Sequence, residues 1–157
     1  ILFKLSPDLT QNELQEIVSV TRECKIHGFI ISNSTHERDN NLKSKHAVEE
    51  GGLCGVPLRD KSTKMIEDVY KLTHGEGVII GCGGIQSGQD AFEKILAGAS
   101  AVQIYSSFIY HGPPVVTKIK RELSELLIKN GYANVSEAVG KGVRIERRRR
   151  FKWIPFL

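Results

Sequence analysis

Four short stretches of this 157-residue chain carry side chains that could bind a ligand, and each lies within or directly after an apolar run. Lys4 lies near the end of the first run, and Ser32-Asn33-Ser34, Gly83-Gly84 and Tyr105-Ser106 follow or end the next three. Glycines let backbone amides approach a ligand closely, and the N-terminus of a following helix favours an anion such as phosphate. A lysine inside an apolar strand either reaches solvent or meets an anion, because a buried unpaired ammonium is very costly. These stretches predict a site for a phosphorylated ligand.

Most of these signals also have a purely structural interpretation. Gly83-Gly84 could form only a tight turn between a strand and a helix, Ser106-Ser107 could only cap a helix, and Asn33 could only cap its own turn. Lys4 is harder to explain by structure alone, so we favour a functional role for it. Three histidines have no partner pattern and are predicted to lie on the surface: His36, His46 and His74.

The apolar runs alternate with amphipathic segments, which predicts four consecutive strand–helix units. The predicted strands are 1–5, 29–31, 78–80 and 101–105, and the predicted helices begin near Thr10, Ser62, Ser87 and Pro113, with a short one over 134–139. Strands that alternate with helices pair in parallel through right-handed crossovers. In such an α/β fold the ligand lies at the carboxyl ends of the strands, where the four stretches are found. Two adjacent strand ends with glycine and serine match the phosphate site of a (β/α)8 barrel.

Each predicted helix carries one apolar stripe that we expect to face inward. The stripes are Leu14, Ile17 and Val18; Met65, Ile66, Val69 and Leu72; Phe92, Ile95 and Leu96; and Val116, Ile119, Leu123, Leu126 and Leu127. Thr10 and Glu13 have the spacing of a capping box. Ser87 caps a later helix, with Asp90 in its first turn. Residues 36–60 are polar and irregular, and a loop of this length usually serves as a lid or a binding loop.

The composition is typical of one soluble globular domain, with 40% hydrophobic and 25% charged residues. No apolar run is long enough to span a membrane. We find no signal peptide, and because the chain begins at Ile1 rather than at methionine, a targeting segment can precede it. Cys24, Cys54 and Cys82 have neither disulfide nor zinc spacing, so we expect reduced thiols and no metal site.

The net charge of +4 is concentrated near the C-terminus. The segment from Arg144 to Lys152 holds six basic residues and one acidic residue, which leaves 16 basic and 17 acidic residues, a net charge of −1, in the rest of the chain. The body of the protein therefore lacks the basic surface of a nucleic-acid-binding protein, and we expect no nucleic-acid partner.

Two stretches of the chain are highly specific, "GGL-x-G-x-PLR" and "GGI-x-SG-x-DA-x-EKI-x-AGAS". They resemble the C-terminal half of the class 2 dihydroorotate dehydrogenases, which are quinone-dependent and membrane-associated, and the resemblance runs from Ile1 to about Gly142. The stretches "FKLSPDLT", "GFIISNST" and "KIKRELSELL" add to it, and "YHGPP" points to class 2. The resemblance implies an FMN-binding (β/α)8 TIM barrel, of which this chain supplies roughly the second half, strands five to eight.

The resemblance also implies roles for individual residues. Lys4 would meet the flavin ring near its N1–C2=O edge, and Ser32, in place of the usual threonine, would also contact FMN. Asn33 and Ser34 would hydrogen-bond the ring of dihydroorotate or orotate. The remaining FMN-binding residues would approach the flavin and its phosphate: Gly55, Gly83, Gly84, Tyr105 and Ser106.

The activity implied by the resemblance is the oxidation of dihydroorotate to orotate, with electrons passed through FMN to ubiquinone. This reaction belongs to pyrimidine synthesis and, by resemblance, to the mitochondrial inner membrane. The catalytic serine of class 2, the quinone tunnel and the membrane attachment belong to an N-terminal half that this sequence does not contain. We therefore name no catalytic residue and expect the chain alone to be incomplete for catalysis. Cys54 stands where "GGLSG" normally has serine and is expected to be a passive thiol.

Two other functions stay open at the level of sequence. The chain could belong to another phosphate-binding (β/α)8 enzyme, although such an enzyme does not need Lys4 together with Ser32-Asn33-Ser34. It could also be a truncated product that binds FMN or phosphate without catalysis. Beyond a barrel part over 1–142, residues 143–157 are expected to be a divergent, disordered tail; its four consecutive arginines and its aromatic residues leave binding to an anionic membrane surface as the alternative.

Overall fold

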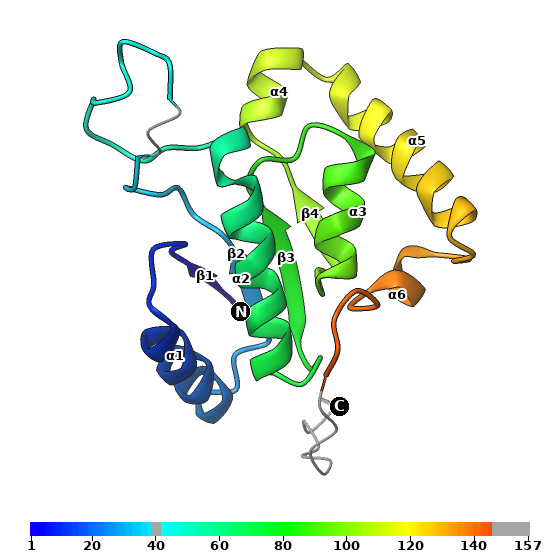
Figure 1. Cartoon of the computed structure of the whole chain (residues 1–157). Coiled ribbons are helices and arrows are strands. Elements are labelled where there is room, and N and C mark those ends of the chain that lie inside the picture. Colours follow the sequence, from blue (N-terminus) through cyan, green and yellow to red (C-terminus); the bar gives the residue numbers. More distant parts are fainter. Residues whose placement is uncertain (39–41, 146–157) are drawn as a thin grey trace.

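The computed structural model describes residues 1–38 and 42–145, and one parallel sheet of four strands lies at its centre. The strands are β1 (Leu2–Leu5), β2 (Gly28–Ile31), β3 (Val78–Cys82) and β4 (Ala101–Gln103), paired in the order β1-β2-β3-β4 (Figure 1). The register aligns four residues in one row across the sheet: Lys4, Ile30, Ile80 and Ala101. The four carboxyl ends therefore lie along one edge of the sheet, as the sequence predicts.

At least one helix follows each strand, which confirms the predicted strand–helix order. The helices are α1 (Gln11–Glu23), α2 (Arg59–Leu72), α3 (Gly88–Leu96), α4 (Ser106–His111), α5 (Pro114–Lys129) and α6 (Val135–Ala138), and a 3₁₀ turn, η1 (Val56–Leu58), precedes α2. Three predicted boundaries are wrong by two residues or more: β3 ends at Cys82 rather than at Ile80, β4 ends at Gln103 rather than at Tyr105, and α2 begins three residues before Ser62. The short helix α4 is not among the predicted elements.

Both predicted helix caps are present. The Thr10 hydroxyl accepts a hydrogen bond from the backbone N–H of Glu13 at 3.3 Å, and the Glu13 carboxylate accepts one from the Thr10 N–H at 2.8 Å. Ser87 and Asp90 form the same reciprocal pair at the start of α3. Each box satisfies backbone donors that a helix leaves unpaired at its first turn, which explains why these two helices begin where the sequence predicts.

The main core lies between the sheet and helices α1 and α2. Its buried members are Leu5, Leu14, Val18, Phe29, Ile31, Met65, Ile66, Val69, Ile79, Ala97 and Ala99. The predicted stripes of α1 and α2 therefore face inward, with Ile17 and Leu72 partly buried at the border of the core.

The prediction that Val116 of α5 faces inward is wrong. Val116 is 41% exposed, whereas its neighbour Val115 is buried together with Ile119 and with Ala91 of α3. Residues four apart share one face of a helix, and the row that packs on α3 therefore starts at Val115. Val116 lies beside this row and faces away from it.

The described helices leave one face of the sheet open. Leu5 is buried in the core, whereas Lys4 is exposed and Ile30, its partner in the register, is only half-buried. Successive residues of a strand point to opposite faces, so this pattern separates a covered face from an open one. β1 and β4 each pair with one strand, and Phe3 of β1 is 44% exposed. Parallel sheets normally have both faces covered, so this face and these edges are surfaces of a kind that proteins usually bury.

The surface predictions made from the sequence can be checked within the described residues. His36, His46 and His74 are exposed, as predicted, and the three cysteines are free thiols. Within residues 1–38 and 42–145, no helix has the length and apolar composition needed to cross a membrane. Of the expected tail over 143–157, residues 146–157 lie outside the described residues.

Candidate ligand-binding site

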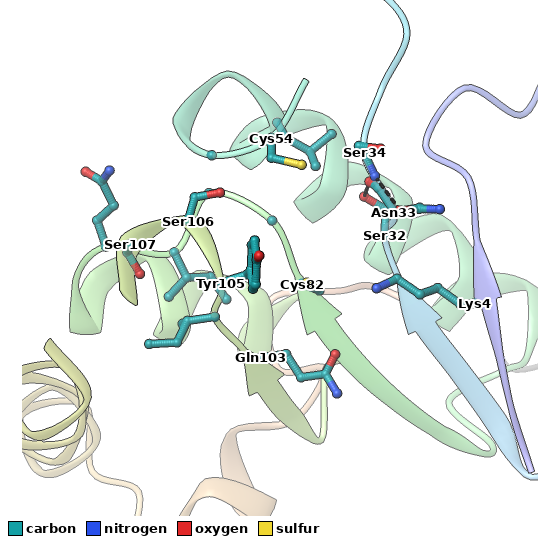
Figure 2. A pocket seen from close by; sticks show the side chains of 17 residues that line it. Lys4, Ser32, Asn33, Ser34, Cys54, Cys82, Gln103, Tyr105, Ser106 and Ser107 are labelled. Atoms are coloured by element: carbon teal, nitrogen blue, oxygen red, sulfur yellow. Dashed lines mark hydrogen bonds between the residues drawn. The ribbon is translucent and has the colours of Figure 1, made fainter. Parts of the chain in front are cut away.

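A cavity of about 260 Å³ lies at the carboxyl ends of the strands (Figure 2). It is lined by all nine residues that the sequence predicts: Lys4, Ser32, Asn33, Ser34, Gly55, Gly83, Gly84, Tyr105 and Ser106. The other lining residues are Cys54, Leu58, Cys82, Ile85, Gln86, Gln103, Ile104 and Ser107. This second group is not predicted from the sequence, although most of its members are direct neighbours of a predicted residue.

The end of β2 is held in place by its own backbone hydrogen bonds. The N–H of Ser32 donates to the Cys82 carbonyl at 2.9 Å, and the N–H of Asn33 donates to the Leu5 carbonyl at 2.8 Å. The Ser32 hydroxyl donates to the Asn33 carbonyl, and the Asn33 side-chain oxygen accepts from the N–H of Ser34. The Asn33 oxygen thus serves a local backbone bond, although no turn forms at this position, and the amide nitrogen has no hydrogen-bond partner among the described residues.

The segment after Ser34 is braced by a carboxylate from another loop. Asp8 accepts hydrogen bonds from the Thr35 hydroxyl at 2.5 Å, from the His36 N–H at 2.8 Å and from the Lys61 ammonium at 2.6 Å. Burial alone would raise the pKa of Asp8, but these hydrogen bonds and the charge of Lys61 outweigh it and lower the pKa to about 2. Asp8 therefore joins the loop after β1 to the loop after β2 and to α2.

The long loop between β2 and α2 returns to the cavity, as expected for a binding loop. Thr35 and Leu53 form an isolated antiparallel bridge, and the Arg38 guanidinium donates to the carbonyls of Glu49 and Gly51. The loop then presents Gly55, whose φ of +85° is in the left-handed region. A Cβ atom at Gly55 would lie 3.6 Å from the Cβ of Ser106, so the loop and the start of α4 come close together at the cavity.

Gly83 and Gly84 form a tight turn that only glycine can adopt. Their φ angles are +117° and +70°, and a Cβ atom at Gly84 would lie 2.4 Å from the Cβ of Arg59. The structural interpretation of this pair is therefore correct, and the pair also lines the cavity. Close packing against α2 and close approach to a ligand both require the absence of a side chain here.

Most backbone amides around the start of α3 already have partners, which corrects one element of the sequence prediction. Within the helix, the N–H of Gly88 donates to the Glu122 carboxylate at 2.7 Å and that of Asp90 to the Ser87 hydroxyl at 3.2 Å; two further amides lie just before the helix. The Asp90 carboxylate accepts hydrogen bonds from the backbone N–H groups of Gln86 and Ser87 at 3.0 and 2.9 Å. Burial would raise the pKa of Asp90, but these bonds and the nearby Arg59 guanidinium lower it. The helix supplies its own anion at these two donors, so a ligand phosphate must rely on other groups of the cavity.

The start of α4 contributes two serines and an exposed tyrosine. No side chain caps this helix, so the interpretation of Ser106-Ser107 as a helix cap is wrong. Ser107 is 4% exposed, and its hydroxyl has no hydrogen-bond partner among the described residues. The Tyr105 side chain is 73% exposed. A buried hydroxyl without a partner is costly, and in a cavity wall it is free to bind a ligand oxygen.

Lys4 of β1 and Cys82, at the end of β3, both line the cavity (Figure 2). Burial raises the pKa of the Cys82 thiol, and the positive charges of Lys4 and Lys94 only partly offset this effect. The thiol therefore stays protonated at neutral pH. The lysine thus brings a positive charge to a wall that is otherwise lined by neutral groups.

The fold and the cavity define a parallel α/β protein with a ligand pocket of lysine, glycine and hydroxyl groups at the carboxyl ends of its strands, as in barrel and doubly wound enzymes. A sequence model of the family described as dihydroorotate dehydrogenase matches residues 1–127. The chain belongs to the dihydroorotate dehydrogenase family, and its relatives below place it in the quinone-dependent class. This membership decides against another phosphate-binding barrel enzyme.

The similarity extends over most of the chain but over a minority of each relative. The mitochondrial quinone-type dihydroorotate dehydrogenase of Mus musculus is 50% identical over 140 residues, which cover 89% of this chain and 35% of that protein. The quinone-type enzyme of Parvibaculum lavamentivorans is 43% identical over 92% of this chain and 42% of its own length. The crystal structure of ligand-free DHODH from Eimeria tenella is 45% identical and superposes with a TM-score of 0.87 over 90% of this chain and 39% of that one. The chain thus spans well under half the length of these relatives.

The residues of the cavity fit a flavin mononucleotide. The partnerless hydroxyl of Ser107 is suited to a phosphate oxygen, and Gly55 leaves open the space that a side chain would narrow. Lys4 supplies a positive charge beside Cys82. The volume of about 260 Å³ lies just below the range of small-molecule pockets, about 300 to 1,000 Å³, so these residues would surround only part of such a ligand.

Proposed function

We propose that residues 1–142 form the second half, strands five to eight, of an FMN-binding (β/α)8 barrel that oxidises dihydroorotate to orotate and passes the electrons to ubiquinone in pyrimidine biosynthesis. The observation that supports this most is the meeting of Lys4, Ser32-Asn33-Ser34, Gly83-Gly84 and Ser106 in one cavity. An enzyme that binds only a phosphate does not need all of these groups together. Residues 143–157 would then be a separate tail.

The chain's residues would bind and orient rather than perform the proton transfer. The chemistry that FMN supplies when bound is hydride acceptance from dihydroorotate and electron transfer to ubiquinone. Lys4 would stabilise negative charge on the flavin ring, with Ser32 beside it, while Asn33 and Ser34 would hydrogen-bond the substrate ring. The flavin and its phosphate would be surrounded by Gly55, Gly83-Gly84 and Tyr105-Ser106. Their backbone and hydroxyl groups would donate hydrogen bonds that stabilise the negative charge of the ligand.

The open face and the two edge strands support a half-barrel. β1 and β4 each lack a neighbour on one side within the described residues, and Lys4 and Ile30 point to the uncovered face. Closing the barrel would cover this face and remove both edges. We assign the catalytic serine, the quinone site and any attachment to the mitochondrial inner membrane to the N-terminal part of the complete enzyme. A truncated product that binds FMN without catalysis is the second candidate, because the same edges favour self-pairing.

Two experiments test these candidates. In the first, the 157-residue chain is passed over a gel-filtration column with FMN, and visible absorbance shows whether flavin elutes with a folded species. In the second, residues 1–142 replace the matching segment of the Mus musculus relative, and dihydroorotate is added without oxygen. We expect the chimera to bind FMN, to be reduced by dihydroorotate and to be reoxidised by ubiquinone.

The outcomes separate the candidates. A chimera that binds FMN but is not reduced, beside an active unmodified mouse protein, would support the inactive candidate. A chimera that folds but binds no flavin would overturn the FMN site itself.

A further inference from the structure

Lys94 is a fully buried lysine next to the cavity that the proposed function does not use. It lies on α3 with 0% exposure, and its ammonium donates to the Arg59 carbonyl at 3.2 Å, to the Ser62 hydroxyl at 3.1 Å and to the Thr63 hydroxyl at 2.8 Å. All three of these partners in the described part of the chain are uncharged oxygen atoms. An ammonium has three N–H donors, so the protonated form satisfies every one of them.

This hydrogen bonding leads directly to the glycine turn of the cavity. The Ser62 hydroxyl, which accepts from Lys94, donates in turn to the Cys82 carbonyl at 2.6 Å. Cys82 is followed by Gly83-Gly84, and a Cβ atom at Gly83 would lie 3.2 Å from the Cβ of Ser62. The ammonium is therefore linked through one side chain to the turn that lines the cavity.

Lys94 also joins the elements on both sides of that turn. Its stem lies beneath β3, where a Cβ atom at Gly81 would come within 3.2 Å of its Cδ. Its ammonium binds the first turn of α2, against which Gly84 packs. A shift of Lys94 would therefore move α2 and the turn relative to each other.

We propose that Lys94 is a positioning residue of the cavity, which holds the Gly83-Gly84 turn through Ser62 and favours an anionic ligand there by its positive charge. The charge of a buried ammonium with neutral partners is incompletely compensated, and an anion bound at the adjacent turn would compensate it. The inference rests on the proposed function for the identity of the anion, FMN, but not for the link between Lys94 and the turn.

The protonation of Lys94 should then be coupled to ligand binding. Burial lowers the pKa of Lys94 to about 8. The ionisable groups that face it are Cys82 of β3, Arg59 and Asp60 of α2, and Asp90 of its own helix. A neutral amine has one donor fewer, so deprotonation must break one of the three hydrogen bonds and remove the charge. If a bound anion raises this pKa by one unit, affinity falls about tenfold once Lys94 loses its proton.

The test uses the chimera described above with Lys94→Met, and with Lys64→Met as the matched control. Lys64 is exposed on α2 and pairs with Asp68, so its substitution removes the same charge without removing any of the hydrogen bonds that Lys94 makes. FMN affinity is measured from pH 6.5 to 9.5 by flavin fluorescence, and the amide resonances of Gly83 and Gly84 are followed in flavin-free protein labelled with ¹⁵N-glycine. Ser62→Ala serves as a second variant if Lys94→Met does not fold.

We expect the unmodified chimera and Lys64→Met to lose about tenfold in FMN affinity as the pH rises through the range around 8, with both glycine resonances titrating in the same range. Lys94→Met should bind FMN weakly at every pH, without this slope, and Ser62→Ala should abolish the response of the glycines. A purely structural lysine would leave the pH slope in Lys94→Met unchanged, and glycine resonances that do not titrate would also overturn the proposal. If no variant binds FMN, the proposed function fails, while the glycine titration still decides the role of Lys94.

Discussion

The Asp8 carboxylate lies 2.6 Å from the Lys61 ammonium and joins the loop after β1 to helix α2. The same carboxylate accepts hydrogen bonds from the Thr35 hydroxyl and the His36 N–H, directly after the predicted substrate residues Asn33 and Ser34. One acidic side chain therefore fixes the position of three separate segments around the cavity.

This contact predicts a dependence of stability on pH. The folded state lowers the pKa of Asp8 from 3.8 to about 2, so the unfolded chain binds this proton more readily. The stabilisation is complete above about pH 4 and is lost as the pH falls toward 2, with a size of about 2 kcal/mol. Thermal unfolding of Asp8→Asn should show this loss of stability at pH 7, and its stability should depend less on pH below pH 4. Glu16→Gln, on the exposed face of α1, should keep the original profile; the same flattening in that control would disprove the assignment to Asp8.

Gly84→Ala should be far more damaging than the same change at another left-handed glycine. Gly84 has a φ of +70° and an added Cβ would meet Arg59 at 2.4 Å, whereas Gly131 has a φ of +77° with nothing within 4 Å. We expect about 1 kcal/mol of destabilisation for Gly131→Ala and about 3 kcal/mol or more for Gly84→Ala, by urea unfolding. Equal costs at the two sites would mean that α2 moves aside.

Lys4→Ala in the chimera should abolish the reduction of flavin by dihydroorotate. The substitution removes the positive charge beside Cys82 in the cavity wall, while the exposed position of Lys4 leaves the fold intact. Anaerobic bleaching of the flavin absorbance measures the effect, and Lys45→Ala, in the exposed part of the long loop, is the control. Normal bleaching in Lys4→Ala would show that this lysine does not serve the flavin.

Ser107→Ala should have opposite effects on the free and the ligand-bound protein. The buried hydroxyl has no partner among the described residues, so its removal should stabilise the ligand-free protein slightly, by about 1 kcal/mol or less. It should weaken FMN binding, because the phosphate loses a donor, by about 1 kcal/mol. Thermal unfolding of the chimera without FMN measures the gain in stability, and the further stabilisation on adding FMN measures the loss of binding. Unchanged stabilisation by FMN in Ser107→Ala would place the phosphate elsewhere in the cavity.

The sequence alone was sufficient for the order of the elements and for nine of the seventeen residues that line the cavity, of which Gly55 followed only from the family resemblance. Apolar periodicity, the capping box at Thr10 and the glycines after β3 are local properties, so they can be read without knowledge of long-range contacts. Parallel pairing then places every strand end on one edge, which is why residues as distant as Lys4 and Ser106 could be grouped correctly.

The tertiary structure decided what depends on contacts between distant segments. Asp90 accepts from the amides of Gln86 and Ser87, just before α3. The hydroxyl of Ser107 is buried and has no partner within the described part of the chain, and the Lys94 ammonium is linked through Ser62 to the backbone next to the glycine turn. The inward face of α5 likewise shifted to Val115, because its contact with α3 determines which side of the helix is buried. Local patterns determine which residues can form an element and where a strand ends. Which side chains are left without partners, or with neutral ones, follows only from the packing of elements that are far apart in the chain.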